Sequence, residues 1–161
     1  QTHVELQKTT GNLTHALKSS SVRGQWGELQ LRRVVELAGM KKHIDYDEQV
    51  ATDQGRPDMI VYLPNGGFLP IDSKSPMSSY FEAVESTDKK IQDAKFLDHA
   101  RAMRSRAIEL AKKTYWQQFD PSPEFVIMFI PNEASLSVAF ENAPEFLDPP
   151  SYPREGNPGI L

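Results

Sequence analysis

The sequence contains no cysteine, so disulfide bonds, thiolate zinc sites and cysteine nucleophiles are all excluded. It has no apolar run of the roughly 18 residues that a membrane-spanning helix needs, and no signal-peptide pattern opens it. Its four histidines are scattered without the spacing of metal ligands, which argues against a histidine zinc site. We therefore expect a cytoplasmic protein without membrane contact, in which any metal ion is held by oxygen ligands. Such ligands suit Mg²⁺ or Mn²⁺.

Acidic residues outnumber basic ones overall, 22 to 18, but positive charge is concentrated in one segment. The 161 residues are 39% hydrophobic and 25% charged, as in an ordinary soluble domain, and the net charge of −4 does not suggest a nucleic-acid-binding protein. Between residues 89 and 116, however, eight basic residues stand against only three acidic ones. A local basic surface could bind phosphate groups, and a solvated helix face would have the same composition. Composition alone leaves both interpretations open.

Hydrophobic periodicity outlines the fold. It predicts helices at residues 24–37, about 80–84, about 87–116 and 134–140, and strands at 46–51, 59–63, 68–72 and 125–130. The strands at 59–63 and 68–72 are apolar on both faces, so we expect them in the middle of a sheet. A helical crossover precedes the last strand, which favours a parallel pair there. The predicted fold class is therefore α/β, with a central mixed sheet flanked by helices.

Individual residues refine this outline. The buried face of the first helix is expected to comprise Trp26, Leu29, Val34 and Leu37, and that of the long helix Phe96, Ala100, Met103, Ala107, Leu110 and Thr114. Pro70 cannot donate a backbone hydrogen bond, so an edge, a bulge or an irregular start is expected at that strand. We expect Tyr115 and Trp116 to anchor the long helix to the core, with base stacking as a second possibility.

The clearest chemical signal comes from the two apolar segments that a Pro-Asn-Gly-Gly turn at residues 64–67 joins. Asp58 stands at the start of the first segment, and Asp72 and Lys74 stand at the end of the second. If the segments form a hairpin, these three side chains can converge at one end of it. Two carboxylates and an ammonium group could bind a divalent cation and activate a water molecule, which is nuclease chemistry. Alternatively, Asp72 and Lys74 form an ordinary same-face salt bridge worth about 0.2–1 kcal/mol.

A wider set of motifs lies in consistent order along residues 10–143. They are the sequences at residues 23–31, 46–49, 56–58, 71–74, 99–101 and 115–116. Together they resemble the RmuC family of bacterial DNA recombination proteins. That family is placed in the PD-(D/E)xK nuclease superfamily, whose core is a helix, three strands, a helix and a strand. The resemblance thus implies a restriction-endonuclease-like core, in agreement with the predicted order of elements.

The resemblance also implies roles for individual residues. It makes Asp58 and Asp72 metal ligands and Lys74 the catalytic lysine. In the predicted hairpin, independently of the resemblance, the backbone carbonyl of Ser73 is a further candidate metal ligand. Glu28 matches the acid that the superfamily often contributes from its first helix, whereas the alternative is a solvent-facing or capping glutamate. Gln49 could line the same pocket, although a strand glutamine that faces solvent is the more ordinary interpretation.

Basic residues of the long helix are candidates for contact with DNA phosphates. They are Arg101, Arg104, Arg106 and Lys112. The three arginines cannot share one helix face, so at least one is expected to be an ordinary surface charge. His99 is interpreted as a partly buried polar residue rather than an acid or base.

The chain is expected to comprise three regions. Residues 1–22 are expected to be the end of a helix or coiled coil through which the protein could form homo-oligomers, residues 23–143 the nuclease-like core, and residues 144–161 an irregular tail or truncated remainder. The resemblance implies a longer protein with an N-terminal membrane segment, of which this chain would be an excised part. Two functions remain: a Mg²⁺- or Mn²⁺-dependent deoxyribonuclease in DNA recombination or repair, and a DNA-binding or scaffolding domain that keeps the nuclease fold with little activity.

Overall fold

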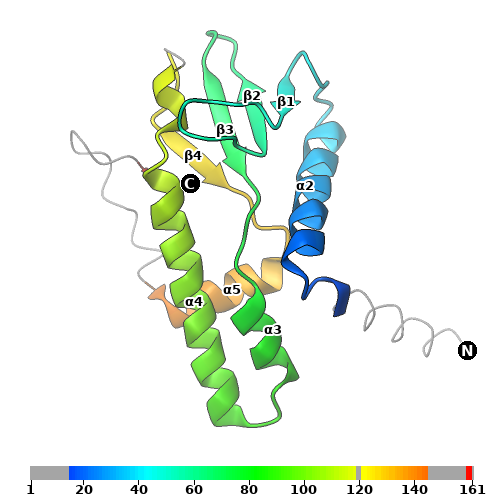
Figure 1. Ribbon diagram of the computed structural model, residues 1–161, viewed down its shortest axis with the longest axis vertical. Helices are drawn as coiled ribbons and strands as arrows, with labels where there is room; N and C mark the ends of the chain where they lie inside the picture. The colour runs from blue at the N-terminus through cyan, green and yellow to red at the C-terminus, as the bar shows by residue number, and fades with distance from the viewer. Residues whose placement is uncertain (1–14, 119–120, 145–158, 161) are drawn as a thin grey trace, which may run out of the picture.

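The computed structural model describes residues 15–118, 121–144 and 159–160 (Figure 1). Its elements are α2 (Ser20–Leu37), β1 (Tyr46–Glu48), β2 (Met59–Tyr62), β3 (Phe68–Asp72), α3 (Ser78–Glu85), α4 (Lys89–Ala111), the 3-10 helix η1 (Tyr115–Gln118), β4 (Phe125–Met128), α5 (Glu133–Asn142) and β5 (Gly159–Ile160). The helices and strands follow the predicted order, so the α/β class is confirmed. No helix among the described residues is long and apolar enough to cross a membrane.

The strands form one mixed sheet in the order β1-β2-β3-β4-β5. The first three are antiparallel neighbours, and β4 pairs in parallel with both β3 and β5. Met59 of β2 lies opposite Ile71 of β3, and Ile71 lies opposite Ile127 of β4. The mixed sheet and the interior positions of β2 and β3 are therefore as predicted from their apolar character.

Helices cover the two faces of the sheet. On one face, Leu31 and Val35 of α2 form a buried cluster with Tyr46, Met59 and Ile71. On the other face, Leu110 of α4, Tyr115 and Trp116 pack with Val126 of β4. Complete burial of each large apolar side chain contributes about 1.5–3 kcal/mol, so these two clusters hold the layers together. They also confirm that Tyr115 and Trp116 anchor the end of the long helix to the core.

Helix α4 carries most of the apolar stripe that its periodicity predicts, although Phe96 and Thr114 are only half-buried and Thr114 lies beyond the end of the helix. Its buried residues are His99, Ala100, Met103, Ala107 and Leu110. The helix begins after Asp88, whose side chain accepts hydrogen bonds from the backbone N–H groups of Lys90 and Ile91. It ends at Ala111, earlier than predicted, because Thr114 has a left-handed backbone with a φ of 43° that breaks the helix before η1. The far half of α4 extends beyond the sheet with α3 beside it (Figure 1).

The predicted buried face of α2 is wrong. Leu29, Val34 and Leu37 are exposed, Leu37 to 88%, and the helix buries Gly27, Leu31 and Val35 instead. The prediction followed side-chain size. The helix instead turns Gly27 toward the end of β3, where an added Cβ atom would lie only 3.1 Å from the carbonyl oxygen of Ser73.

Pro70 lies in a central strand rather than at an edge. Phe68 donates its backbone N–H to Oγ of Ser122, at 2.8 Å, on the side of β3 that faces β4. Backbone nitrogens two residues apart point to the same side of a strand, so the nitrogen of Pro70 also faces β4. Pairing between β3 and β4 begins only at Ile71, opposite Ile127. The missing donor of Pro70 therefore falls at an irregular start of the pairing, one of the three possibilities that the sequence left open.

The ends of the chain add one unexpected element. Gly159 and Ile160 pair in parallel with Phe125 and Val126 of β4, in a segment where the sequence predicts only an irregular tail. The rest of that tail beyond residue 144 lies outside the described residues, as does most of the predicted N-terminal coiled coil, at residues 1–14.

Candidate functional site

Asp58 is tied to the end of β3 by two short hydrogen bonds. The backbone N–H and the hydroxyl of Ser73 both donate to Oδ2 of Asp58, at 2.8 and 2.9 Å. Asp58 is only 5% exposed and its neighbour across the hairpin, Asp72, only 2%. Because β2 and β3 are antiparallel, the start of one and the end of the other meet, as the hairpin argument predicts. The sequence thus brings Asp58, Asp72 and Ser73 to one end of the hairpin.

Gln49 links Asp58 to the helix on the adjoining face. Its side-chain Nε2 donates to Oε2 of Glu28 at 3.1 Å and to Oδ1 of Asp58 at 3.2 Å. The residue is half-buried and has a φ of 56°, which is uncommon for a residue with a side chain. The interpretation of Gln49 as a solvent-facing strand residue is therefore wrong. Its amide places partial positive charge between two carboxylates that would otherwise repel each other.

Glu28 reaches the site because Gly27 allows α2 to approach β3. A Cβ atom at Gly27 would lie 3.1 Å from the carbonyl oxygen of Ser73. That carbonyl, a predicted metal ligand, therefore faces the helix that carries Glu28. Burial, followed by the negative charge of Asp58, raises the pKa of the Glu28 carboxyl, while the charge of Lys74 opposes this rise. Glu28 is thus half-buried and linked to Asp58 through Gln49, rather than a freely solvent-facing or capping residue.

Asp72 points to the face of the sheet that α4 covers, opposite to the face on which α2 packs. Neighbouring strand residues point to opposite faces, so Asp72 faces α4 while Ile71 packs on α2. Nη2 of Arg106 lies 3.1 Å from Oδ1 of Asp72, and the backbone N–H of Lys74 donates to the same oxygen at 3.1 Å. Arg106 is itself only 18% exposed. The buried carboxylate is therefore neutralised by an arginine that the sequence assigned to DNA.

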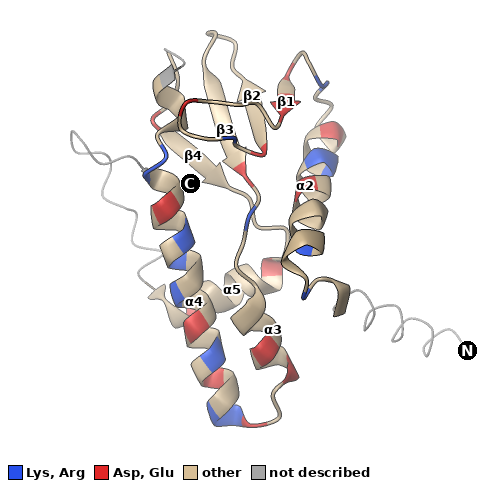
Figure 2. Cartoon of the chain, in the orientation of Figure 1, with Lys and Arg blue, Asp and Glu red and all other residues tan. Residues whose placement is uncertain are grey.

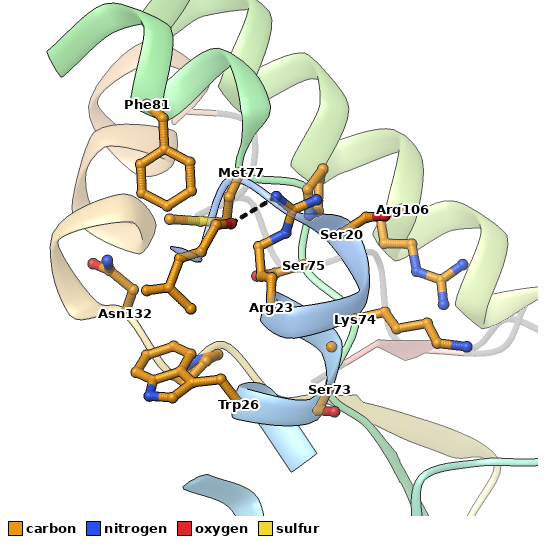
Figure 3. Close-up of a pocket in the computed structure, with 14 residues that line it drawn as sticks. Ser20, Arg23, Trp26, Ser73, Lys74, Ser75, Met77, Phe81, Arg106 and Asn132 are labelled. Atoms are coloured by element: carbon orange, nitrogen blue, oxygen red, sulfur yellow. Dashed lines mark hydrogen bonds between the residues drawn. The ribbon is translucent and has the colours of Figure 1, made fainter. Parts of the chain in front are cut away.

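Lys74 lies beside a pocket of about 360 Å³ between α2, the segment after β3, and the helices α3, α4 and α5 (Figure 3). The pocket is lined by Leu17, Ser20, Arg23, Gly24, Trp26, Ser73, Lys74, Ser75, Pro76, Met77, Phe81, Arg106, Pro131 and Asn132. Ser73, Lys74 and Arg106 therefore belong both to the pocket and to the immediate surroundings of the two buried aspartates. The catalytic candidates and the cavity form one continuous region.

The acids do not form a closed metal cage. Within residues 15–118, 121–144 and 159–160, no three histidine, aspartate or glutamate side chains are grouped closely enough to hold a metal ion by themselves. Asp58 and Asp72 could offer carboxylate oxygens, with the carbonyl of Ser73 and water completing the ligands. Such an all-oxygen set suits Mg²⁺ or Mn²⁺, which bind with several waters.

The remaining basic candidates lie on α4 or just after it, and Figure 2 shows the lysines and arginines of α4 as blue bands along the helix. Arg101 and Arg104 are exposed on the side of the helix away from the core, and Lys112, just after the helix, is exposed as well. Arg101 makes a long ion pair with Asp98, at 3.8 Å. Arg106 differs from the other two arginines. It points inward to Asp72, while the exposed Glu109 lies beside it at the surface, so Arg106 is not an ordinary surface charge.

His99 is fully buried and holds two helices together. Its Nε2 lies 2.9 Å from the carbonyl oxygen of Ser135 in α5. Burial lowers the pKa of the imidazole. The interpretation of His99 as a buried polar residue rather than a catalytic one is in keeping with this packing.

Two residues of the site were misread from sequence. Gln49 lies within the motif at residues 46–49, and this motif was the only sequence feature that suggested a role for it. Its left-handed backbone conformation could not be inferred from the sequence. Arg106 is 34 positions from Asp72, and only its inward position on the helical repeat of α4, one turn from Met103, set it apart.

Comparisons with known proteins agree with the motifs. The model of the RmuC family matches residues 1–149. The chain is 41% identical over 89% of its length to the DNA recombination protein RmuC homolog of Chlamydia pneumoniae, covering 34% of that protein. It is 36% identical over 84% of its length to the homolog of Zymomonas mobilis and 31% identical over 89% to that of Pseudomonas aeruginosa, covering 32% and 33% of them. No solved structure matches the chain.

Proposed function

Because the chain belongs to the RmuC family, we propose that it is a metal-dependent nuclease domain that hydrolyses DNA phosphodiester bonds during recombination. The names of its relatives support a recombination-related role. The chain spans about a third of the length of these relatives, so the activity, the DNA substrate and the partners of the whole protein are part of the proposal.

The observation that carries the proposal is the burial of two carboxylates beside one lysine. Taking a charge out of water costs several kcal/mol, and a buried ion pair such as Asp72 with Arg106 is often no more stable than apolar residues in its place, so a purely structural domain has little reason to bury both Asp58 and Asp72 at one end of the hairpin. Lys74 follows Asp72 on the same segment, and its backbone N–H donates to the Asp72 carboxylate. This arrangement suits a site that handles a cation and a phosphate group.

Each residue has a distinct task in such a site. Asp58 and Asp72 would hold a divalent cation together with the Ser73 carbonyl, and the ion would supply an activated water and screen charge on phosphorus. Lys74 provides a fixed positive charge toward the phosphate as negative charge develops on it. Gln49 keeps Glu28 directed at Asp58 through its two hydrogen bonds.

Cleavage of labelled DNA with Mg²⁺ or Mn²⁺ tests the proposal. Asp72→Asn and Lys74→Ala should each abolish most of the activity, because one removes a carboxylate charge and the other the fixed cation. Matched controls are Asp53→Asn and Lys90→Ala, which change exposed residues outside the site. The nuclease would be excluded if both site variants cleaved DNA at the wild-type level. It would also be excluded if the wild-type protein cleaved no DNA with any metal tried.

A second candidate function is a DNA-binding or scaffolding domain with little activity. The observation in its favour is that protein groups already engage the carboxylates. Both oxygens of Asp58 accept hydrogen bonds, and Oδ1 of Asp72 binds Arg106. Such a domain would bind DNA in the same assay without cutting it, and Asp72→Asn would leave that binding unchanged.

A further inference from the structure

The pocket beside the candidate site has walls of two kinds. Leu17, Met77 and Phe81 form a buried apolar cluster on which Trp26 packs. Figure 3 shows Trp26, Met77 and Phe81 on one side of the pocket, with Lys74 and Arg106 on the other and Arg23 between them. An occupant that fits this cavity needs an apolar part and an anionic part.

Two of the three cations make no ion pair with a described carboxylate, although Lys74 is exposed and lies near enough to Glu28 to oppose the rise in its pKa. Among the described residues, no carboxylate lies within ion-pair distance of the Arg23 guanidinium or the Lys74 ammonium group, whereas Arg106 is paired with Asp72. Arg23 instead donates through Nη1 to the backbone carbonyl of Leu17, at 3.2 Å. Burial also lowers the pKa of Arg23, which reflects the cost of holding this charge away from water. An anion bound beside Arg23 would offset that cost.

The size and the aromatic wall narrow the class of occupant. A pocket of about 360 Å³ is at the lower end of the range for small-molecule sites, and it suits a single nucleoside better than a duplex. Trp26 offers an indole ring, on which any base can stack. A nucleotide joins a planar apolar base to a phosphate, and only an unpaired base can leave the helical stack to enter a cavity.

We propose that this pocket binds one unpaired nucleotide of a DNA strand, with its base against Trp26 and its phosphate beside Arg23. The adjoining phosphodiester then lies toward Lys74 and Asp72. This inference rests on the proposed function, because it names the substrate class of the same site. It makes the protein selective for single strands and frayed ends over intact duplex.

Fluorescence titration without divalent cations tests the pocket separately from cleavage. The probes are a single-stranded oligothymidylate of about eight nucleotides and a blunt duplex of equal length. The single strand should bind more tightly and quench tryptophan emission. The quench should persist in Trp116→Phe, which changes the buried tryptophan of η1, and should disappear in Trp26→Phe.

Affinities measured with the same probes complete the test. Trp26→Ala should weaken single-strand binding by about 5- to 150-fold, the range for loss of one stacked base, and should leave duplex binding unchanged. Arg23→Ala should also weaken it, whereas Arg33→Ala, an exposed arginine on the same helix, should have little effect. Wild-type affinity for the single strand in both Trp26→Ala and Arg23→Ala would overturn the proposal.

A change in the ligand covers the case in which Trp26→Ala does not fold. An oligonucleotide of the same length with abasic positions keeps the phosphates and lacks the bases, so it should bind wild-type protein at least several-fold more weakly. Equal binding of the two oligonucleotides would refute the pocket. Cleavage that persists alongside base-independent binding refutes the pocket alone, and base-dependent binding without any cleavage refutes the nuclease alone.

Discussion

A methyl group added at Gly27 should be far more costly than the same group added one turn earlier, at Gly24. Both residues lie in α2, where alanine is favoured over glycine by about 1 kcal/mol. A Cβ atom at Gly24 would have no neighbour within 4 Å, whereas one at Gly27 would lie 3.1 Å from the Ser73 carbonyl oxygen and 3.6 and 3.7 Å from its side chain. The two substitutions therefore differ only in what the new methyl group meets.

The magnitudes follow from that contrast. Gly24→Ala should stabilise the protein by about 0.5–1 kcal/mol, which raises the melting temperature by about 1–4 °C for a chain of this size. At Gly27 the same gain is opposed by overpacking against β3, which costs about 1–3 kcal/mol. We expect Gly27→Ala to be less stable than Gly24→Ala by about 1–3 kcal/mol.

Urea unfolding followed by circular dichroism measures the difference directly. The two variants should have equal slopes and separate midpoints, with Gly24→Ala at the higher urea concentration. In Gly27→Ala the helix must move a few tenths of an ångström, which also lengthens the 3.1 Å bond between Gln49 and Glu28. If both variants gained the same stability, the close approach of α2 to β3 would not be what shapes this helix.

Three further outcomes can be measured on the same protein. Arg106→Ala should destabilise it by about 2–4 kcal/mol in urea unfolding, because it strips a buried carboxylate of its cation, and a loss below 0.5 kcal/mol would contradict the pairing with Asp72. Because burial lowers the pKa of His99, the unfolded chain binds a proton at this residue more readily than the folded one, so the contribution of His99 to stability should be full above about pH 6.5 and be lost below it. The fall in stability with acid should be shallower in His99→Gln, and an unchanged fall would show that His99 is not its cause. Arg101→Ala and Arg104→Ala should weaken DNA binding and flatten its salt dependence, whereas unchanged salt slopes in both would leave them as solvated surface charges.

The sequence predicted most of the secondary structure and the core of the site. The strands and the turn between β2 and β3 carry their own local signals, and a hairpin brings Asp58 next to the end of β3 by topology alone. The buried face of α2 escaped prediction because it depends on the contact between Gly27 and Ser73, which are distant in the chain.

The orientation of single side chains was harder to predict. The bridge that Gln49 makes depends on a left-handed backbone, which no local pattern marks. The inward direction of Arg106 depends on where α4 crosses the sheet. The strand at Gly159–Ile160 has only two residues and no periodicity, so its pairing with β4 could not be predicted.

The alternation at the end of β3 has a consequence for which sequence changes the family can accept. Ile71 belongs to the apolar cluster under α2, and Asp72 to the polar contacts under α4. Inserting or deleting one residue before them would exchange the two faces, so that the Asp72 carboxylate would enter the apolar cluster under α2 and the Ile71 side chain would take the place of Asp72 beside Arg106. The turn ahead of this strand has little room to absorb such a change, since any side chain at Gly67 would collide with the backbone of Pro121. Descendants of this hairpin are therefore expected to vary by substitution and to keep its length.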